Sequence, residues 1–288
     1  MLATLLVLMA QVPGPALEVR TAAGWRPWRD AEPGSAVTHE ALLAEALTWQ
    51  DSAPGLRSGS FEVRTREGFL RNSIALIELD PARFSFALGV TAPAARRSAE
   101  DWMRADSTLV LTANTGLFRE NGTPQGLVVA DGRRRSALAG WLDAVVVLDP
   151  ATGPRFTDVA AARALPESLA AFQTLPWLVR DGRVALGATS GLRLSRTHRD
   201  RRITLCLGDD GRLRLLLSNF EMFGATAGRV PIGLTIPEQA ALAAGIGCRD
   251  AVALDGGISA QIAFRSGQRM VRMPGWRKVP VMLLVRRR

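Results

Sequence analysis

The stretch Ala251-Val252-Ala253-Leu254-Asp255-Gly256-Gly257-Ile258-Ser259 joins an apolar run to an acid, two glycines and a hydroxyl. Four consecutive apolar residues predict a buried strand. Asp255 then lies at the end of that strand, where a side chain leaves the core. Gly256 and Gly257 permit backbone angles closed to other residues and let a ligand approach the main chain. The stretch predicts a carboxylate beside accessible amides, with a tight turn capped by the acid as the simpler alternative.

A helix is predicted immediately before this strand. Thr235 can cap it, Pro237 fits its first turn, and Glu238 can close a capping box with Thr235. Gly245 and Gly247 end the helix. The local unit is therefore a helix, a short loop, a buried strand and an acidic turn.

Further blocks combine apolar runs with polar residues at fixed positions. A predicted strand over 109–113 leads into Asn114-Thr115-Gly116-Leu117-Phe118 and then Pro124-Gln125-Gly126-Leu127. Another block reads Gln173-Thr174-Leu175-Pro176-Trp177, and a third, Arg201-Arg202-Ile203-Thr204-Leu205-Cys206-Leu207-Gly208-Asp209-Asp210-Gly211, predicts a hairpin.

Together these blocks resemble the phosphodiester glycosidase family, from about residue 60 to the C-terminus. In that family a helix precedes a Gly-Cys-x-x-Ala-x-x-Leu-Asp-Gly-Gly-x-Ser block, which here runs from Gly247 to Ser259. Leu175 stands where many members have glycine, so the local loop shape departs from the family pattern. The resemblance implies hydrolysis of a sugar-1-phosphodiester, and some bacterial relatives are associated with exopolysaccharide biosynthesis.

Breaking the anomeric carbon–oxygen bond calls for a carboxylate that handles water or stabilises a cationic sugar. Asp255 is the predicted carboxylate. Arg202, or Arg201 beside it, is predicted to hold the phosphate, because a guanidinium fork matches phosphate oxygens. The amides of Gly256 and Gly257 are expected to add a small anion nest.

Three polar side chains are expected to orient the sugar or the phosphate. They are Asn114, Gln173 and Ser259, and we count Asn114 among the catalytic residues. The structural alternatives are that Asn114 caps a strand end, that Gln173 is a surface residue, and that Ser259 only makes a hydrogen bond within the turn. A second carboxylate is expected if the mechanism uses two acids. The sequence does not choose among Glu120, Asp143, Asp250 and Glu221. No cofactor and no metal site are expected.

The net charge of +9 and the pI of about 11.2 raise the alternative of a nucleic-acid-binding protein. Lys278 is the sole lysine, and the arginines are spread along the chain without a zinc finger or RNA-binding signature. Aromatic residues make up only 6% of the chain and tyrosine is absent, so base-stacking platforms are scarce. We therefore expect no specific nucleic acid partner but a general attraction to anionic glycans or phosphodiesters.

The N-terminus predicts export to the periplasm or the cell exterior. The apolar run 2–10 and the following Pro13-Gly14-Pro15-Ala16 resemble a secretory signal with cleavage near Ala16, although a basic start is missing. An N-terminal strand of the folded domain is the alternative. No apolar run approaches the length needed to span a bilayer.

Cys206 and Cys248 are the only cysteines, and His39 and His198 the only histidines. In an exported chain the two thiols could pair, and two buried free thiols are an equally good interpretation. We expect His198 in a surface loop and His39 at a helix start.

Strands outnumber helices in the predicted pattern. We expect an α+β fold with a mixed β-sheet core, scattered packing helices and a single domain. The expected division is a leader over 1–20, an extension with a helix over 21–60, and a phosphodiester glycosidase-like domain over 61–288. The expected function is that of an exported hydrolase of sugar-1-phosphodiesters in a glycan or cell-envelope polymer. A non-catalytic glycan-binding or polysaccharide-assembly protein is the alternative.

Overall fold

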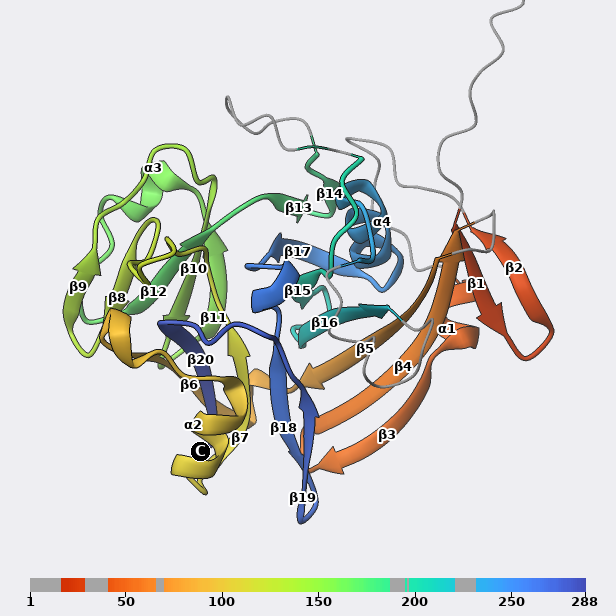
Figure 1. Ribbon diagram of the computed structural model, residues 1–288, viewed down its shortest axis with the longest axis horizontal. Coiled ribbons are helices and arrows are strands. Elements are labelled where there is room, and N and C mark those ends of the chain that lie inside the picture. The colour runs from red at the N-terminus through yellow and green to blue at the C-terminus, as the bar shows by residue number, and fades with distance from the viewer. Residues whose placement is uncertain (1–16, 29–40, 66–69, 187–194, 196, 221–231) are drawn as a thin grey trace, which may run out of the picture.

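Short apolar and alternating runs form most of the strands in the computed structural model, which describes residues 17–28, 41–65, 70–186, 195, 197–220 and 232–288. Within these residues every pairing between strands is antiparallel, and the strands form three sheets (Figure 1). The protein is therefore mostly β, and the expected α+β class gave the helices too much weight. The alanine-rich stretch 157–172 is an example: its alanines favour a helix, yet it holds only one helical turn, α3 (Val159–Ala162), and then gives way to a strand that begins at Ala170.

The largest sheet carries the predicted acidic turn. Its ten strands follow the order β14-β13-β17-β15-β16-β5-β4-β1-β2, with β3 paired to β4. The strands are β1 (Leu17–Thr21), β2 (Gly24–Trp28), β3 (Thr48–Ala53), β4 (Leu56–Thr65), β5 (Arg71–Leu79), β13 (Trp177–Arg180), β14 (Arg183–Val184), β15 (Ile203–Gly208), β16 (Leu213–Phe220) and β17 (Cys248–Ala253).

Two five-stranded sheets complete the fold. One follows the order β11-β10-β12-β8-β9, with β8 (Val128–Ala130), β9 (Arg133–Ser136), β10 (Ala144–Asp149), β11 (Gly153–Thr157) and β12 (Ala170–Thr174). The other follows the order β19-β18-β7-β20-β6, with β6 (Phe84–Val90), β7 (Leu109–Asn114), β18 (Ile262–Ser266), β19 (Arg269–Met273) and β20 (Val281–Arg287).

The described helices are short, and the two longest pack their buried side chains against the faces of the sheets. They are α1 (Ala41–Ala46), α2 (Ala99–Ala105), α3, α4 (Ile236–Gly245) and the 3-10 turns η1 (Pro81–Arg83), η2 (Pro93–Ala95) and η4 (Gly257–Ser259). The predicted capping box of α4 is confirmed, since Thr235 and Glu238 exchange hydrogen bonds at its first turn. None of the helices in the described ranges has the length and apolar character that crossing a bilayer requires.

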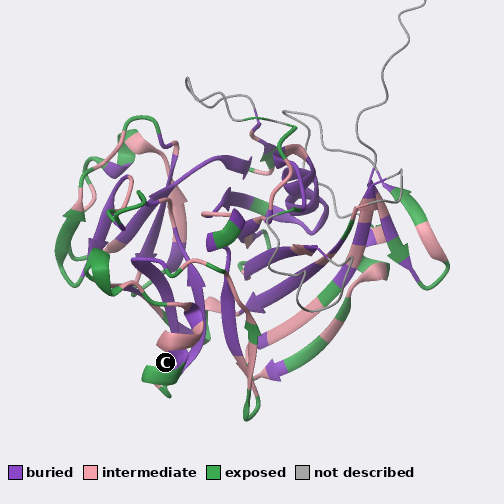
Figure 2. Cartoon of the chain, in the orientation of Figure 1, coloured by how far each residue is buried: buried purple, intermediate pink, exposed green. Residues whose placement is uncertain are grey.

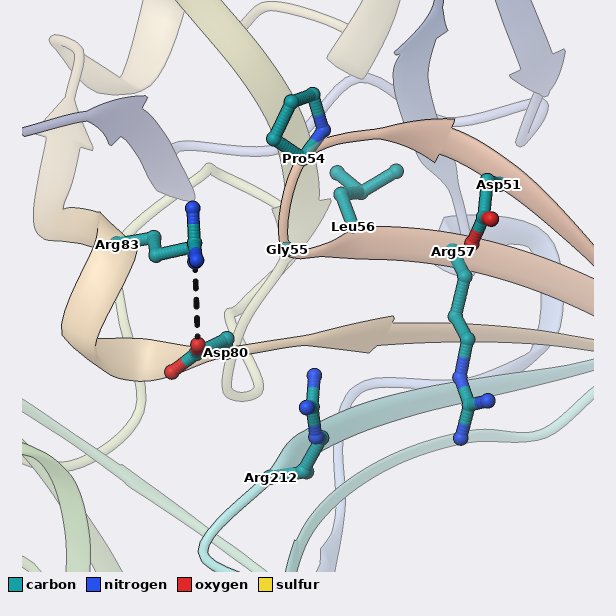
Figure 3. Close-up of a pocket in the computed structure, with 8 residues that line it drawn as sticks. All are labelled: Asp51, Pro54, Gly55, Leu56, Arg57, Asp80, Arg83 and Arg212. Atoms are coloured by element: carbon teal, nitrogen blue, oxygen red, sulfur yellow. Dashed lines mark ion pairs between the residues drawn. The ribbon is translucent and has the colours of Figure 1, made fainter.

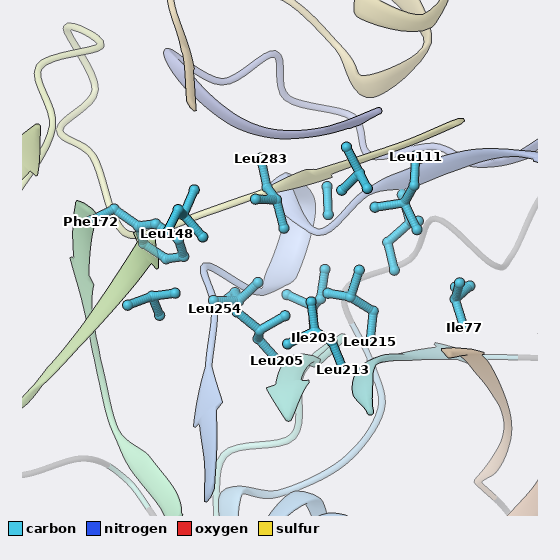
Figure 4. Packing of buried hydrophobic residues seen from close by; sticks show 14 of the residues in the cluster. Ile77, Leu111, Leu148, Phe172, Ile203, Leu205, Leu213, Leu215, Leu254 and Leu283 are labelled. Atoms are coloured by element: carbon cyan, nitrogen blue, oxygen red, sulfur yellow. The ribbon is translucent and has the colours of Figure 1, made fainter. Parts of the chain in front are cut away.

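The central core lies where the three sheets meet. Ile77, Leu205 and Leu215 come from the large sheet, and they pack with side chains of both smaller sheets, Leu111 and Phe172 among them (Figure 4). Figure 2 shows the central strands buried along most of their length, whereas β2 and β9 keep exposed residues. One core shared by all three sheets is what a single domain requires.

Strand β17 is buried on both faces. Val252 points into the central core, while Ala251 and Ala253 pack in a second core beneath α4. A strand covered on both faces reads as a continuous apolar run rather than an alternating one, so the predicted buried strand before Asp255 is confirmed. The predicted hairpin is confirmed as well, because β15 and β16 pair on either side of 209–211.

The N-terminal strands join the same large sheet. Residues 17–20, placed in the leader by sequence, belong to β1, which pairs with β4. The stretch expected to be cleaved, 1–16, and His39 lie outside the described residues.

Cys206 and Cys248 form a disulfide between the adjacent strands β15 and β17. Of the two interpretations left open by the sequence, the structure selects the paired one. Both residues are fully buried beneath α4. The bridge therefore joins the strand that leads to Asp255 with the strand that follows Arg202.

Replacing both cysteines with alanine is expected to lower the free energy of unfolding by about 3 kcal/mol. The bridge closes a loop of 42 residues, and cross-linking a loop of that size removes much of the entropy of the unfolded chain. Urea unfolding of the oxidised wild type and the double variant measures the difference. The variant should also be insensitive to a reducing agent that destabilises the wild type; equal stability of the two oxidised proteins would contradict the prediction.

Candidate active site

Asp255 lies two residues after the end of β17, at the start of the turn that contains η4. Its side chain is half-buried, and its carboxyl accepts a hydrogen bond from the Ser259 hydroxyl. Gly257 has a φ of +59°, in the left-handed region that favours glycine. The backbone amide of Gly257 donates to the Arg201 carbonyl at 2.8 Å, so that amide is already bonded within the chain.

A second carboxylate, Asp200, lies against this turn. A Cβ placed on Gly257 would be 3.1 Å from Oδ2 and 3.3 Å from Oδ1 of Asp200. Only a glycine at 257 therefore leaves ordinary room for the Asp200 carboxylate. Asp200 bridges to Leu234 just before β15, and its Oδ1 accepts the amide of Arg201 at 2.8 Å.

The two carboxyls influence each other's ionisation. Burial raises the pKa of Asp255 to about 7; the Ser259 hydroxyl and the Arg277 cation oppose the shift, and the negative charge of Asp200 adds to it. Burial also raises the pKa of Asp200, against the attraction of Arg202, the hydrogen bond from the Arg201 amide and the attraction of His198. Coupled carboxyls with raised pKa values are typical of acid–base sites.

Two arginines and a histidine flank the pair of aspartates. Arg277 is half-buried, acts on the Asp255 charge and lies over the Phe118 ring, 5.4 Å from its centroid. His198 is exposed, as expected, yet its Nε2 lies 3.9 Å from Asp200 Oδ2. Arg202 acts electrostatically on Asp200. Its guanidinium donates to the carbonyls of Leu234 at 3.0 Å and His198 at 2.8 Å.

Arg201 is fully buried, and its guanidinium connects segments of the chain. Nη1 donates to the carbonyl of Ala260 at 2.6 Å and to that of Pro274 at 2.7 Å. Nε and Nη2 donate to Oδ1 of Asn219 on β16. These contacts hold the turn after Asp255 and the 274–278 loop against β15.

Asn114 holds the backbone of Asp255 in place. Its Nδ2 donates to the Asp255 carbonyl at 2.6 Å, and its Oδ1 accepts the Gln261 amide at 2.8 Å. The Gln261 side chain in turn binds the amide of Ala99 and the carbonyls of Ser259 and Arg277. Gln261 thus joins the Asp255 turn, the Arg277 loop and the start of α2.

Gln173 lies on β12, and its side chain contacts the backbone of the segment 126–142. Its Nε2 donates to the carbonyls of Ala139 and Leu142, and its Oε1 accepts the amides of Leu127 and Ala139. Both ends of this amide are thus bonded to the backbone. Among the described hydrogen bonds, none joins the Gln173 side chain to Asp255 or Ser259.

The four candidates for a second carboxylate have other surroundings. Asp250 lies at the opposite end of β17, where it accepts the Asp181 amide and pairs with Arg249. Asp143 accepts the Trp177 amide, and burial raises its pKa to about 6. Glu120 is exposed, and Glu221 lies outside the described residues.

Sequence reasoning missed Asp200, Arg277 and Gln261. Asp200 immediately precedes the Arg201-Arg202 block, and this adjacency was the available signal. Arg277 carried no signal of its own, because a separate loop brings it to Asp255. Gln261 follows Ser259 by two positions, but nothing in the local sequence shows that its side chain folds back onto the turn. Among the described residues, no three histidine, cysteine or acidic side chains converge as a metal site would require.

Replacing Asp255 with Asn is expected to stabilise the fold at pH 8 and to change it little at pH 4. Between the ordinary pKa near 4 and the native value of about 7 the folded protein holds the extra proton, so wild-type stability falls as pH rises through this window. One pKa unit corresponds to about 1.4 kcal/mol, and partial exposure reduces the total, so we expect a gain on the order of 2 kcal/mol.

Urea unfolding at both pH values measures this effect, with Asp158→Asn as the control. The pKa of Asp158 is lowered by the Ala161 amide and the Arg180 side chain, so its replacement should cost stability at pH 8. A loss of stability in Asp255→Asn at pH 8 would show that the folded protein does not disfavour the ionised form of Asp255, and would contradict the prediction.

The model of the protein family described as phosphodiester glycosidase matches residues 107–286, more than half of the chain. No curated protein sequence matches the chain.

Solved structures share the fold at low sequence identity. The catalytic domain of zebrafish N-acetylglucosamine-1-phosphodiester alpha-N-acetylglucosaminidase, auto-inhibited by its pro-peptide, superposes with a TM-score of 0.63 at 16% identity, over 89% of this chain and 96% of that one. A hypothetical protein from Synechocystis gives 0.61 at 14% identity, over 96% of this chain and 68% of that one. A Burkholderia pseudomallei protein described as exported gives 0.61 at 12% identity, over 90% and 99%.

Proposed function

Because the chain belongs to the phosphodiester glycosidase family, we propose that it hydrolyses the bond between an anomeric carbon and a phosphodiester in a glycan or cell-envelope polymer. The observation that carries this proposal is the pair Asp255 and Asp200: two carboxyls with raised pKa values, where Asp200 lies against the turn that follows Asp255, with Arg277 beside Asp255. The net charge of +9 adds a general attraction for a phosphate-bearing substrate.

Asp255 is the proton-handling group in this proposal. A pKa of about 7 lets it take a proton from the attacking water near neutral pH, where a general base works best. The Ser259 hydroxyl holds the carboxylate, and Asn114 fixes its backbone. The leaving group is a phosphate monoester, which takes the electron pair of the broken carbon–oxygen bond as a stable anion, so it requires little acid assistance.

Asp200 is the second carboxylate, and arginines hold the phosphate. The Asp200 charge stabilises positive charge that develops on the sugar ring as the bond breaks. Arg277 and Arg202 flank the two aspartates, and their guanidinium groups match phosphate oxygens. Arg201 keeps a positioning role, because its side chain holds the turn through Ala260.

We also propose that the protein acts outside the cytoplasm. The Cys206–Cys248 disulfide is favoured in an oxidising compartment. A protein of the same fold from Burkholderia pseudomallei is described as exported, and the N-terminal sequence resembles a signal peptide. At such a location the available substrates would be sugar phosphates within envelope polymers and exopolysaccharides.

The test is hydrolysis of a panel of sugar-1-phosphodiesters, including the methyl diester of α-N-acetylglucosamine 1-phosphate, in water labelled with oxygen-18. Attack at the anomeric carbon places the label in the released sugar. Label in the phosphate would show cleavage of the phosphorus–oxygen bond and overturn the proposed reaction. Absence of release across the panel would favour a glycan-binding role for this fold.

A further inference from the structure

A polar hollow lies at the end of the large sheet away from Asp200. The turn between β3 and β4, the residue after β5 and the residue before β16 surround it (Figure 3). Its volume is about 360 Å³. The residues that line it are Asp51, Pro54, Gly55, Leu56, Arg57, Asp80, Arg83 and Arg212.

This hollow is separate from the candidate active site. Asp200 precedes β15, whereas Arg212 follows β15 beyond the 209–211 turn. The strand between them places the two sites roughly 20–25 Å apart. A single sugar residue cannot contact both.

Three guanidinium groups surround the hollow, and each is held through Nε. Nε of Arg57 lies 2.7 Å from Glu78 Oε1, Nε of Arg212 lies 3.7 Å from the same oxygen, and Nε of Arg83 lies 3.4 Å from Asp80 Oδ2. In the described part of the chain, the ion pairs of these three arginines with acids are made through Nε and not through the terminal nitrogens. Figure 3 shows the three side chains standing around one space.

The acid behind the hollow is shared among several arginines. The buried Glu78 faces Arg57, Arg212 and also Arg214, whose Nε lies 2.9 Å from its Oε2. Asp210 takes part of the Arg214 charge. A guanidinium that is oriented by a buried acid but still exposes its fork is prepared to bind a phosphate or carboxylate.

The remaining wall suits a sugar ring better than a bare anion. Pro54 and Leu56 give an apolar surface, and the Asp51 carboxylate offers acceptors for hydroxyl groups. Gly55 has a φ of +78°, and a Cβ there would lie 2.5 Å from Cδ of Arg83, so the glycine lets Arg83 lie against the turn. The volume falls within the range of pockets for small ligands and exceeds the need of one phosphate.

We propose that this hollow binds one anionic sugar residue of a glycan. Arg57, Arg83 and Arg212 hold its phosphate or carboxylate, and Asp51 accepts its hydroxyl groups. The site does not depend on Asp255 and works whether or not the protein is a hydrolase. It would anchor an anionic polymer away from the candidate active site.

The test uses the full chain at low ionic strength, titrated with glucose 1-phosphate, glucuronate, glucose and inorganic phosphate. Calorimetry gives the affinity, and tryptophan fluorescence reports locally, because Arg57 lies 4.1 Å from the centroid of the Trp49 ring. We expect glucose 1-phosphate or glucuronate to bind more tightly than phosphate, and glucose not to bind. The tighter of the two sugars identifies which anion the site takes.

Matched variants locate the binding. Arg212→Gln and Arg83→Gln should each weaken it at least tenfold, whereas Arg133→Gln on the exposed strand β9 should leave it unchanged. The Arg variants replace exposed side chains, and their melting curves check that they fold. Unchanged affinity in both Arg variants, or phosphate binding as tightly as the sugars, would overturn the proposal.

Discussion

Asp255→Asn is expected to lower kcat/KM for a sugar-1-phosphodiester by about 10²–10⁴, the range that loss of a general acid–base group produces. The amide cannot accept a proton from water, yet it keeps the shape of the side chain and its contact with Ser259. Release of free sugar under single-turnover conditions measures the loss.

The control for this variant is Asp250→Asn, which changes a carboxyl at the other end of the same strand. Asp250 binds the Asp181 amide and Arg249, so its replacement should leave the catalytic step intact. Activity of Asp255→Asn within tenfold of the wild type would remove Asp255 from the mechanism. The stability gain at pH 8 described above shows independently that the variant is folded.

Asp200→Asn is expected to lower kcat/KM by about 10² and to shift the pH profile to lower pH. With Asp255 acting as a base, wild-type activity should rise with pH through its pKa of about 7. The Asp200 charge contributes to raising that pKa, because a like charge disfavours ionisation. Removing it makes Asp255 ionise at lower pH, so the acidic limb of the profile moves down.

The pH profiles of kcat/KM for the wild type and Asp200→Asn check this prediction. A lower rate with an unmoved limb would mean that Asp200 supports the fold without interacting with Asp255. The double variant Asp200→Asn/Asp255→Asn should be hardly slower than Asp255→Asn, because residues that act as a unit are not additive. Additive losses would contradict a coupled pair.

Local sequence was sufficient where a structure is specified by neighbours along the chain. The capping box at Thr235, the buried strand before Asp255 and the hairpin after Arg202 each depend on spacings of a few residues, and each is confirmed. The relative amounts of helix and strand were harder to predict from the sequence. A run of alanines near 159–164 favours a helix locally, yet the pairing of β12 with β10 and β8 limits it to one turn.

The candidate site divides in the same way. Asp255 was found because its acid, glycines and hydroxyl are consecutive and form one turn. Asp200 was missed because its relation to Asp255 spans 55 positions of the chain and exists only where β15 and β17 pair. The function of Gln173 as an orienting residue remains a prediction from the family resemblance, and its described contacts are with the backbone.

The sequence by itself determined the family, the acidic turn and the cationic character of this protein, because these depend on composition and on residues close together in the chain. Tertiary structure alone decided that the two cysteines pair, that Arg201 is buried while Arg202 lies beside Asp200, and that Asp200 and Arg277 act on Asp255. The physical reason is that burial and charge proximity set a pKa, and both arise only when distant segments pack together.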